Sequence, residues 1–322
     1  MHKHAKRLLA LAALSLAAGT AAAQSWPAQP IRWIVPYPAG GGTDVVARTV
    51  ASGLEKPLGQ TIVVENRPGA ATIIGATAIA QAEANGYMVG TADSGTLAFN
   101  PSLYAKLSYD PSKFTYIGGI AKFPLLLAVN VNSPFKTVDD VLQAAKKEPG
   151  KLSAASAGAG SPHHLALELF KQRTNANVLH VPYKGAAPAV QDLLGGQVDL
   201  MFIDLASGLP NVKAGKLRVL AAATPERVAA LPDVPTMAEQ GVPNFTAYAW
   251  QGLVGPAGLP EPVVKKLAAE LDATLKSPAV SQKMLDMGVI PMPLSSQEFK
   301  AYAEQERSTW ADVIKKAGIK LE

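Results

Sequence analysis

The sequence contains no cysteine, and this absence excludes several kinds of chemistry. A chain without thiols has no disulfides, no thiol nucleophile and no cysteine-ligated metal. It also has no cysteine to which a lipid anchor could be attached. Beyond the N-terminal region the sequence lacks an apolar run of the ~20 residues that a membrane span needs. The longest such run, residues 123–131, is typical of a buried strand.

An excess of charge of one sign is also missing. The chain has 30 basic and 25 acidic residues, and removal of Lys3, Lys6 and Arg7 with a leader would leave 27 against 25, a net charge of +2. No basic run with interleaved aromatic residues is present, so we expect no nucleic-acid partner. The length suits two domains of ordinary size.

The first 23 residues have the layout of a secretory signal peptide. The three basic residues form a positive start, residues 8–18 are apolar, and three alanines at 21–23 form a small-residue cleavage site before Gln24. A membrane anchor is the alternative, but the apolar run is shorter than a span. We therefore predict a signal peptide over 1–23 and an exported protein without membrane insertion.

The segment from Ile31 to Asp44 predicts an anion-binding junction. An apolar strand ends in a proline and glycine turn, and a helical pattern follows with an apolar face of Val46, Val50, Leu54 and Leu58. Thr43 or a glycine would cap this helix, and Asp44 would lie in its first turn. Such a junction directs backbone N–H groups and the positive end of the helix dipole at a ligand.

The rest of the chain alternates between strand and helix patterns, which is typical of parallel α/β sheets. We predict strands over residues 61–65, 87–92, 123–131, 152–157, 178–181, 198–203 and 217–223. We predict helices over residues 72–84, 137–147, 164–173 and 187–194. Residues 93–96 have the composition of a polar loop.

Two later junctions repeat the first design. Residues 156–164 place Ser161 as an N-cap before Pro162, and residues 181–188 contain a glycine turn before a helix with a proline near its start. In open α/β sheets ligands bind outside the carboxyl ends of the strands. Three such helix N-termini predict a small anionic ligand, a carboxylate above all, held by N–H groups and hydroxyls.

Other interpretations are less well supported by the residues. Glycine turns are common in any α/β protein, and Gly158-Ala-Gly160 lacks the third glycine of a dinucleotide fingerprint. His163 and His164 are adjacent and point in different directions on a helix, which favours hydrogen bonding or capping over a metal site. Asp204 ends an apolar strand, where an acid holds a loop or, as a second possibility, binds a ligand. Glu306 on a C-terminal packing face is expected to bond a neighbouring polar group.

A series of motifs makes the chain resemble the extracytoplasmic solute receptors of the tripartite tricarboxylate transporter family, also called Bug-type receptors. The resemblance covers essentially the whole mature chain. Its motifs, in order, are Pro30-Ile-Arg-x-x-Val-Pro36, Gly40-Gly-Gly-x-Asp44, Leu58-Gly-Gln-x-x-Val-Val-Glu-Asn-Arg-Pro-Gly69, Asn100-Pro-x-Leu-Tyr104, Pro149-Gly-Lys-Leu152, Gly160-Ser-x-x-His-Leu165, His180-Val-Pro-Tyr-Lys-Gly185, Asp192-Leu-Leu-Gly-Gly-Gln-Val-Asp199, Ala214-Gly-Lys-Leu-Arg218, Leu231-Pro-Asp-Val-Pro-Thr236 and Glu306-x-x-x-Trp310.

The resemblance implies a type II periplasmic binding protein-like fold, in which two α/β lobes enclose a ligand cleft. It implies a discontinuous lobe 1 of residues 24–125 and 248–322 and a lobe 2 of residues 126–247. The chain would cross between the lobes near residues 123–127 and 248–254. Such receptors bind a di- or tricarboxylate, an aromatic acid or an acidic amino acid by domain closure. They deliver it to a membrane permease with one large and one small subunit.

The resemblance also assigns site residues and partners. The ligand-binding candidates carried onto this sequence are Tyr37, Gly41, Gly42, Thr43, Ser94, Ser156, Gly160, Ser161, His164, Tyr183, Lys184 and Asp204. We expect a periplasmic monomer with no enzymatic activity, no cofactor and no metal. Two alternatives stay open: a sensor component that signals to a kinase, and an exported enzyme acting on a carboxylate.

Overall fold

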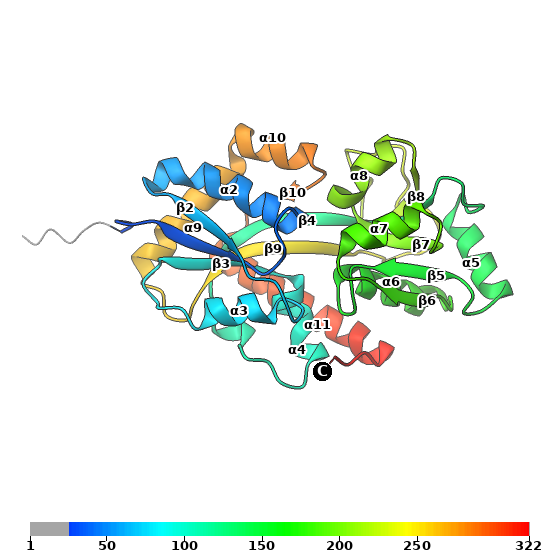
Figure 1. Ribbon diagram of the computed structural model, residues 1–322, viewed down its shortest axis with the longest axis horizontal. Coiled ribbons are helices and arrows are strands. Elements are labelled where there is room, and N and C mark those ends of the chain that lie inside the picture. The colour runs from blue at the N-terminus through cyan, green and yellow to red at the C-terminus, as the bar shows by residue number, and fades with distance from the viewer. Residues whose placement is uncertain (1–25, 322) are drawn as a thin grey trace, which may run out of the picture.

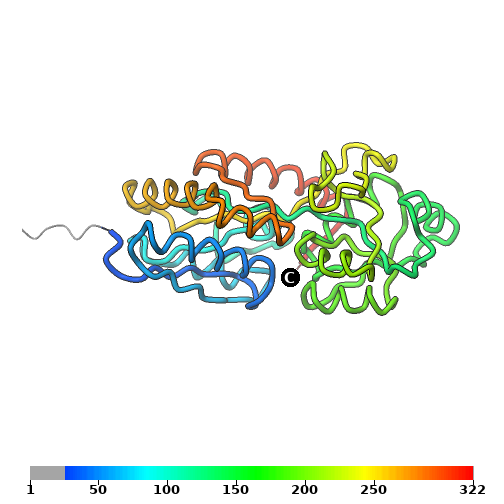
Figure 2. The backbone as a smooth tube through the Cα atoms, turned by 90° about the horizontal axis from the view of Figure 1, so that it is seen from above, coloured from blue at the N-terminus to red at the C-terminus, as the bar shows by residue number. Residues whose placement is uncertain are grey.

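The computed structural model describes residues 26–321, so the predicted signal peptide lies outside the described residues. The chain forms two α/β lobes that lie side by side along the long axis of the molecule (Figures 1 and 2). Two strands, β4 (Thr115–Asn130) and β9 (Tyr248–Gly255), run along this axis near the junction of the lobes (Figure 1). The two-lobed α/β fold expected from the sequence is confirmed.

The first lobe is built on a mixed sheet in the order β2-β1-β3-β9-β4. Strands β1 (Ile31–Val35), β2 (Ile62–Asn66) and β3 (Met88–Asp93) are parallel, and β9 runs antiparallel between β3 and β4. The short β10 (Ile290–Pro291) pairs with β4. The helical elements are α2 (Gly42–Leu58), α3 (Ile73–Ala80), η1 (Gly95–Phe99), α4 (Asn100–Leu103), η2 (Pro111–Lys113), α9 (Glu261–Lys276), α10 (Pro278–Asp286) and α11 (Ser296–Ala317).

The second lobe repeats this plan. Strands β5 (Ser153–Ser156), β6 (Leu179–Pro182) and β7 (Leu200–Asp204) are parallel, and β4 pairs antiparallel with both β7 and β8 (Leu217–Ala222). The helices are α5 (Val138–Lys147), α6 (Pro162–Thr174), α7 (Ala186–Leu194) and α8 (Leu205–Lys213). The predicted parallel arrangement therefore holds for three strands of each lobe, while the strands shared between the lobes make each sheet mixed.

Strand β4 changes its partner at a proline. It pairs with β9 from Thr115 to Pro124 and with β7 from Leu125 onwards. Pro124 has no backbone N–H to give to a ladder, so a change of sheet is tolerated at this position. The strand therefore places the carboxyl-end loops of the first lobe opposite those of the second (Figure 1).

Apolar packing holds the helices to these sheets. Trp33 of β1 and Leu271 of α9 are buried in one cluster with the apolar face of α2. A second cluster covers the opposite face and runs through both lobes, from Trp250 and Phe299 to Phe202. Full burial of one such side chain contributes about 1.5–3 kcal/mol. Because the cluster is shared, the lobes are joined by apolar contacts as well as by the strands.

The alanine-rich helix predicted over residues 72–84 is present but shorter, Ile73–Ala80, and it follows three residues with left-handed backbone conformations, with Thr72 at φ 77°. One local prediction is wrong. Residues 93–96, expected to be a polar loop, are the end of β3 and the start of the buried turn η1. This segment can be buried because the carboxylate of Asp93 accepts the N–H of Thr96 at 2.9 Å.

The cap predictions agree with the structure. Ser161 caps α6 through the N–H of His164, and Pro162 occupies the first helical position. Thr137 forms a capping box at the start of α5. Glu306 accepts the indole N–H groups of Trp250 at 2.9 Å and Trp310 at 3.1 Å, as its position on a packing face suggested. None of the helices within residues 26–321 is long and apolar enough to cross a membrane.

Candidate functional site

The first loop ends at a helix without a side-chain cap. Gly41 is the N-cap of α2, and within the described chain no side chain accepts a capping hydrogen bond there. The side chain of Asp44 instead bonds the loop: its Oδ2 accepts a hydrogen bond from the N–H of Gly40 at 2.9 Å, and its Oδ1 accepts one from the side-chain amide of Asn66 at 2.8 Å. The first N–H groups of α2, at Gly42 and Thr43, are therefore left to bind an anion.

Hydrogen bonds around this loop keep the carboxylate of Asp44 ionised. Burial would raise its pKa, but hydrogen bonds from Arg48, Gly40 and Asn66 outweigh burial and lower the pKa below its usual range. The carboxylate is therefore ionised at neutral pH and is satisfied by these donors. Since the amide of Asn66 also donates to the carbonyl of Tyr37 at 2.9 Å, the whole loop is fixed in place.

Tyr37 lies in the same loop, but its hydroxyl points into the first lobe. The hydroxyl donates to Oδ2 of Asp93 at 2.5 Å, and burial together with this carboxylate raises the pKa of Tyr37 well above its usual value. Ser94, the next residue after Asp93, is fully buried. Its Oγ has no hydrogen-bond partner among residues 26–321. Tyr37 thus anchors the loop, while the hydroxyl of Ser94 remains without a structural role.

The N-terminus of α2 meets the N-terminus of α8 across the two lobes. A Cβ added at Gly42 would lie 3.5 Å from the ring of Phe123 and 3.9 Å from Cβ of Ala206. Ala206 is in the first turn of α8, which Asp204 caps. The fold therefore brings together Gly41, Gly42 and Thr43 from the first lobe with Asp204 from the second.

Asp204 is paired with a histidine that we did not include among the site residues. Its Oδ1 accepts the N–H of Ser207 at 2.8 Å, and its Oδ2 lies 3.3 Å from Nε2 of His163 in the first turn of α6. Burial would raise the pKa of Asp204, but the bonds from His163 and Ser207 lower it below the usual range. These contacts tie Asp204 to the first turns of α8 and α6.

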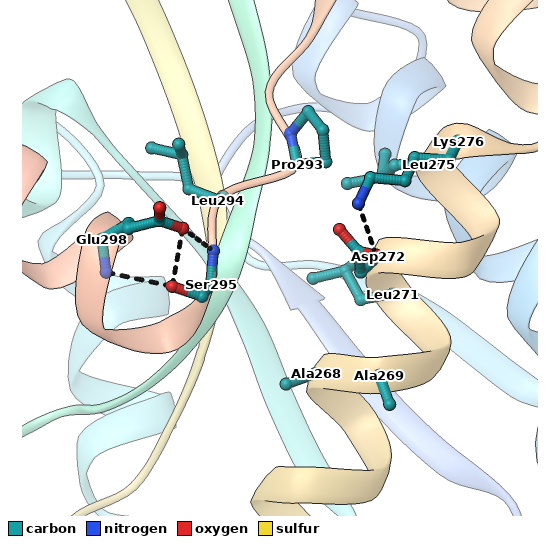
Figure 3. A pocket seen from close by; sticks show the side chains of 11 residues that line it. Ala268, Ala269, Leu271, Asp272, Leu275, Lys276, Pro293, Leu294, Ser295 and Glu298 are labelled. Carbon is teal, nitrogen blue, oxygen red and sulfur yellow. Dashed lines mark hydrogen bonds and ion pairs between the residues drawn. The ribbon is translucent and has the colours of Figure 1, made fainter.

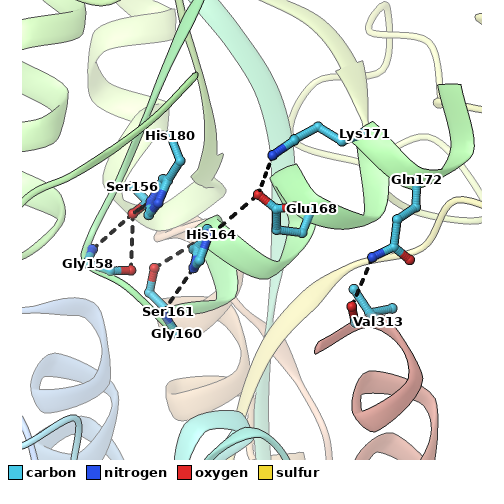
Figure 4. Close-up of polar contacts among 10 residues, drawn as sticks. All are labelled: Ser156, Gly158, Gly160, Ser161, His164, Glu168, Lys171, Gln172, His180 and Val313. Atoms are coloured by element: carbon cyan, nitrogen blue, oxygen red, sulfur yellow. Dashed lines mark hydrogen bonds and ion pairs between the residues drawn. The ribbon is translucent and has the colours of Figure 1, made fainter. Parts of the chain in front are cut away.

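The predicted residues of the 156–164 loop form a separate cluster (Figure 4). Oγ of Ser156 lies 2.6 Å from Nε2 of His180 and accepts the N–H of Gly158 at 3.1 Å. The ring of His164 stacks on that of His180 at 3.7 Å, and its Nδ1 accepts the N–H of Gly160 at 3.1 Å. Burial and the neighbouring His164 lower the pKa of His180 to about 4. These side chains hydrogen-bond one another and shape the loop.

This loop rests against the first lobe. Gly160 has φ +76°, and a Cβ there would lie 2.8 Å from Leu103 of α4 and 2.9 Å from Leu321. At the other end of α6, the amide of Gln172 donates to the carbonyl of Val313 on α11 at 2.9 Å (Figure 4). Glycine is favoured at position 160 because any other residue would be strained at this positive φ, and a Cβ there would require the ends of the two leucine side chains to shift.

Tyr183 and Lys184 lie in the loop before α7. The N–H of Tyr183 donates to the carbonyl of Ser156 at 3.0 Å, so the two loops of the second lobe are adjacent. The hydroxyl of Tyr183 donates to Oδ2 of Asp192 at 2.6 Å, and this bond raises the pKa of Tyr183 to about 12. Lys184 is exposed. Of this pair, Lys184 is the side chain that stays available to an anion.

One further buried group was missed by the sequence reasoning. Gln251 of β9 is paired with Asp93 of β3, so the two side chains are on one face of the sheet, near Tyr37. Gln251 is fully buried, and neither atom of its amide has a hydrogen-bond partner in the described part of the chain. A lone glutamine inside an apolar strand was the only signal in the sequence.

A surface hollow of about 510 Å³ lies apart from these residues, between α9 and the start of α11 (Figure 3). None of the predicted site residues lines it. Its charged groups are already paired, Lys276 with Asp272 at 2.8 Å and Glu298 with Ser295 at 2.7 Å. Within residues 26–321, no group of three or more His, Asp and Glu side chains could hold a metal ion.

Comparison with known proteins places the chain in a family. The profile of TctC, the tripartite tricarboxylate transporter family receptor, matches residues 46–319. The chain belongs to this family. It is similar to protein BugT of Bordetella pertussis, with 36% identity over 324 residues that cover 98% of each chain.

Solved structures of TctC-like proteins share the fold. Rpa4515 of R. palustris, solved with adipate, superposes with a TM-score of 0.86 and 35% identity over 92% of this chain and 99% of that one. MatC from Rhodopseudomonas palustris, with bound malate, gives a TM-score of 0.82 and 33% identity over 90% of this chain and 100% of that one. The family expected from the sequence motifs is confirmed.

Proposed function

We propose that this TctC family member is a periplasmic receptor that captures a small carboxylate between its lobes and delivers it to a tripartite tricarboxylate-type permease. The observation that carries the proposal is the approach of the N-terminus of α2 to that of α8, at Gly42 and Ala206. A helix N-terminus favours a negative charge through its N–H groups and its dipole. An anion at this position would contact both lobes.

The nature of the anion is supported by the relatives. A protein similar over nearly its whole length was solved with adipate, and another with malate. Both ligands are small dicarboxylates. The twelve residues predicted from the motifs remain our candidates, with Gly41, Gly42, Thr43 and Lys184 as the groups best able to bind a carboxylate directly.

Capture would proceed by domain closure. We propose lobe boundaries at residues 24–125 with 248–322 and at residues 126–247, with β4 and β9 as the connections that bend. A ligand that touches both lobes stabilises the closed state by the difference between its affinities for the two states. The permease would then recognise the closed receptor, and the receptor itself would catalyse no reaction.

The proposal can be tested by ligand binding to the chain from Gln24 onwards. Thermal unfolding is measured with mono-, di- and tricarboxylates, aromatic acids and acidic amino acids, with neutral sugars as the control. A ligand at a hundred times its Kd adds about 2.7 kcal/mol to the free energy of unfolding. For a chain of this size this raises Tm by about 4 °C. An increase in Tm with sugars alone would contradict the proposal. So would the absence of any Tm increase with the carboxylates.

A further inference from the structure

Gly288 of the first lobe lies directly against the start of α8 in the second lobe. A Cβ added at Gly288 would lie 2.6 Å from Cγ of Leu205 and 3.4 Å from its backbone carbonyl carbon. Leu205 is the first residue of α8, and Gly288 lies in the turn that follows α10 (Figure 1). Gly288 is not among the predicted ligand-binding residues, so this contact joins the lobes at a second place.

Each side of this contact is fixed by the core of its own lobe. Met284 and Val289, on either side of Gly288 in the chain, are buried in the apolar cluster that contains the inner face of α2. Leu205 is 1% exposed and belongs to an apolar cluster of the second lobe. Its Cγ is in the middle of the side chain, and close packing leaves a buried leucine little room to turn away. A side chain at position 288 is therefore accommodated by moving the lobes apart.

The contact lies beside the point where β4 passes from one lobe to the other. The residue two positions after Gly288 pairs with Lys122 of β4. The residue directly before Leu205 pairs with Leu125 of β4. Between these two positions β4 contains the proline at which it changes its partner strand. A bend of β4 at this crossing therefore changes the distance between Gly288 and Leu205.

The same turn of α8 also faces the proposed ligand site. Ala206 follows Leu205, and its Cβ would lie 3.9 Å from a Cβ added at Gly42. Asp204 caps the turn by a side-chain hydrogen bond, so the turn moves as one unit. Two glycines of the first lobe thus contact this turn, Gly42 at the proposed ligand site and Gly288 outside it. A displacement of the turn at Gly288 also changes the gap between α8 and α2.

We infer that Gly288 is a positioning residue, whose lack of a side chain lets the first turn of α8 pack against the first lobe and so sets the gap in which the ligand is held. It acts through Leu205. The inference rests on the proposed function, since it concerns closure of the lobes around the carboxylate. A side chain at position 288 holds the lobes further apart, so a ligand that must touch both lobes binds more weakly.

Gly288→Ala tests the inference, and Gly59→Ala is a matched control. Gly59 follows α2 as Gly288 follows α10, and their φ angles are +69° and +74°. At both positions the glycine N–H donates to the carbonyl three residues back, and the next N–H donates to the carbonyl five residues back. Within the described chain, however, a Cβ at Gly59 would have no atom within 4 Å. Both substitutions strain the backbone, and only Gly288→Ala presses on the other lobe.

Affinity and the distance between the lobes are measured together. Isothermal titration uses succinate, malate, adipate and citrate, and we expect Gly288→Ala to weaken binding about 10-fold, as overpacking predicts, while Gly59→Ala keeps the parent affinity. The chain has no cysteine, so spin labels can be attached at Leu285→Cys on α10 and Lys213→Cys on α8, both at exposed positions. We expect Gly288→Ala, and not Gly59→Ala, to lengthen the distance between the labels.

Leu205→Ala shows whether the effect passes through this contact. It removes the Cγ that a Cβ at position 288 would meet, so Gly288→Ala should cause no further loss of affinity in the Leu205→Ala background. Circular dichroism and thermal unfolding check that each variant is folded.

The outcomes are distinguishable. The inference requires both the loss of affinity and the longer distance in Gly288→Ala. Absence of either change relative to Gly59→Ala, or additive losses in the double variant, would overturn it and leave the receptor function standing. Absence of binding of every acid by the parent protein would instead contradict the proposed function, and the inference would be abandoned with it.

Discussion

The hydroxyl of Tyr37 donates to Oδ2 of Asp93 across 2.5 Å, and this bond ties the first loop to the end of β3. Oδ1 of Asp93 lies 2.7 Å from the hydroxyl of Thr96, which lies 2.9 Å from that of Thr72. Thr72 is the last of three residues with left-handed backbone conformations. A buried polar network therefore connects the two loops that precede α2 and α3.

Replacement of Tyr37 by phenylalanine should weaken this network. Tyr37→Phe leaves Oδ2 of the buried Asp93 without its donor, so we expect the free energy of unfolding to fall by about 1–3 kcal/mol. Urea denaturation measures the change. Tyr87→Phe is the control, because the hydroxyl of Tyr87 makes its contact with Ala28 at an exposed position and its loss should cost less than about 0.5 kcal/mol. Equal effects in the two variants would contradict the prediction.

A larger side chain at position 42 should lower the affinity for the ligand while the protein stays folded. Gly42→Val adds methyl groups at a position from which a Cβ would already touch Phe123 and Ala206, at 3.5 and 3.9 Å. Overpacking of this kind costs about 1–3 kcal/mol. We expect it to destabilise the closed state and not the fold of each lobe, so the ligand affinity should fall by about 10- to 100-fold. Calorimetric titration and thermal unfolding measure the two effects. Gly42→Ala is the matched control, whose single methyl fits. Unchanged affinity in Gly42→Val would remove the first loop from the site.

His180 should make stability depend on pH. Its pKa is about 4 in the folded protein, against an ordinary value of about 6.5, so the unfolded chain binds the proton more readily. Stability is then complete above about pH 6.5 and decreases as the pH falls toward 4. We expect the wild type to lose about 1–2 kcal/mol between pH 7 and pH 5 that His180→Gln does not lose. Urea denaturation at both pH values measures this, and parallel losses would refute it.

The buried amide of Gln251 should be dispensable for folding. Its two amide atoms find no partner in the described residues, so Gln251→Met removes an unsatisfied group while keeping a similar volume. We expect the free energy of unfolding of the ligand-free protein to rise by about 1 kcal/mol. Gln172→Met is the contrast, because it deletes the 2.9 Å bond to Val313 and should destabilise. A less stable Gln251→Met variant would show that the amide has a structural role.

Local signals in the sequence were reliable where the partner is near in the chain. The cap at Ser161 and the cap of α2, predicted at Thr43 or a glycine and found at Gly41, both depend on residues within one turn, and both predictions are confirmed. The motifs also identified the family. The wrong prediction lies at residues 93–96, whose burial also depends on the contact between the hydroxyls of Thr96 and Thr72, which are 24 residues apart in sequence.

The residues of the site also show that contacts between distant segments could not be predicted from the sequence. Asp204 was predicted because it ends an apolar strand, but its partner His163 is 41 residues away and was assigned only a general bonding role. No sequence pattern predicted a role for Gln251, because its position beside Asp93 depends on the pairing of β9 with β3. The closeness of Gly42 and Ala206 likewise depends on the course of β4 between the lobes.

The sequence by itself determined the alternation of strands and helices, the caps at their ends and the family, because each of these is written in short spacings and ordered motifs. Only the tertiary structure decided which helix N-termini face one another and which buried polar atoms remain without a partner. The physical reason is that hydrogen bonding and burial are satisfied between segments far apart in the chain. A residue's availability for a ligand is therefore known only after its distant neighbours are in place.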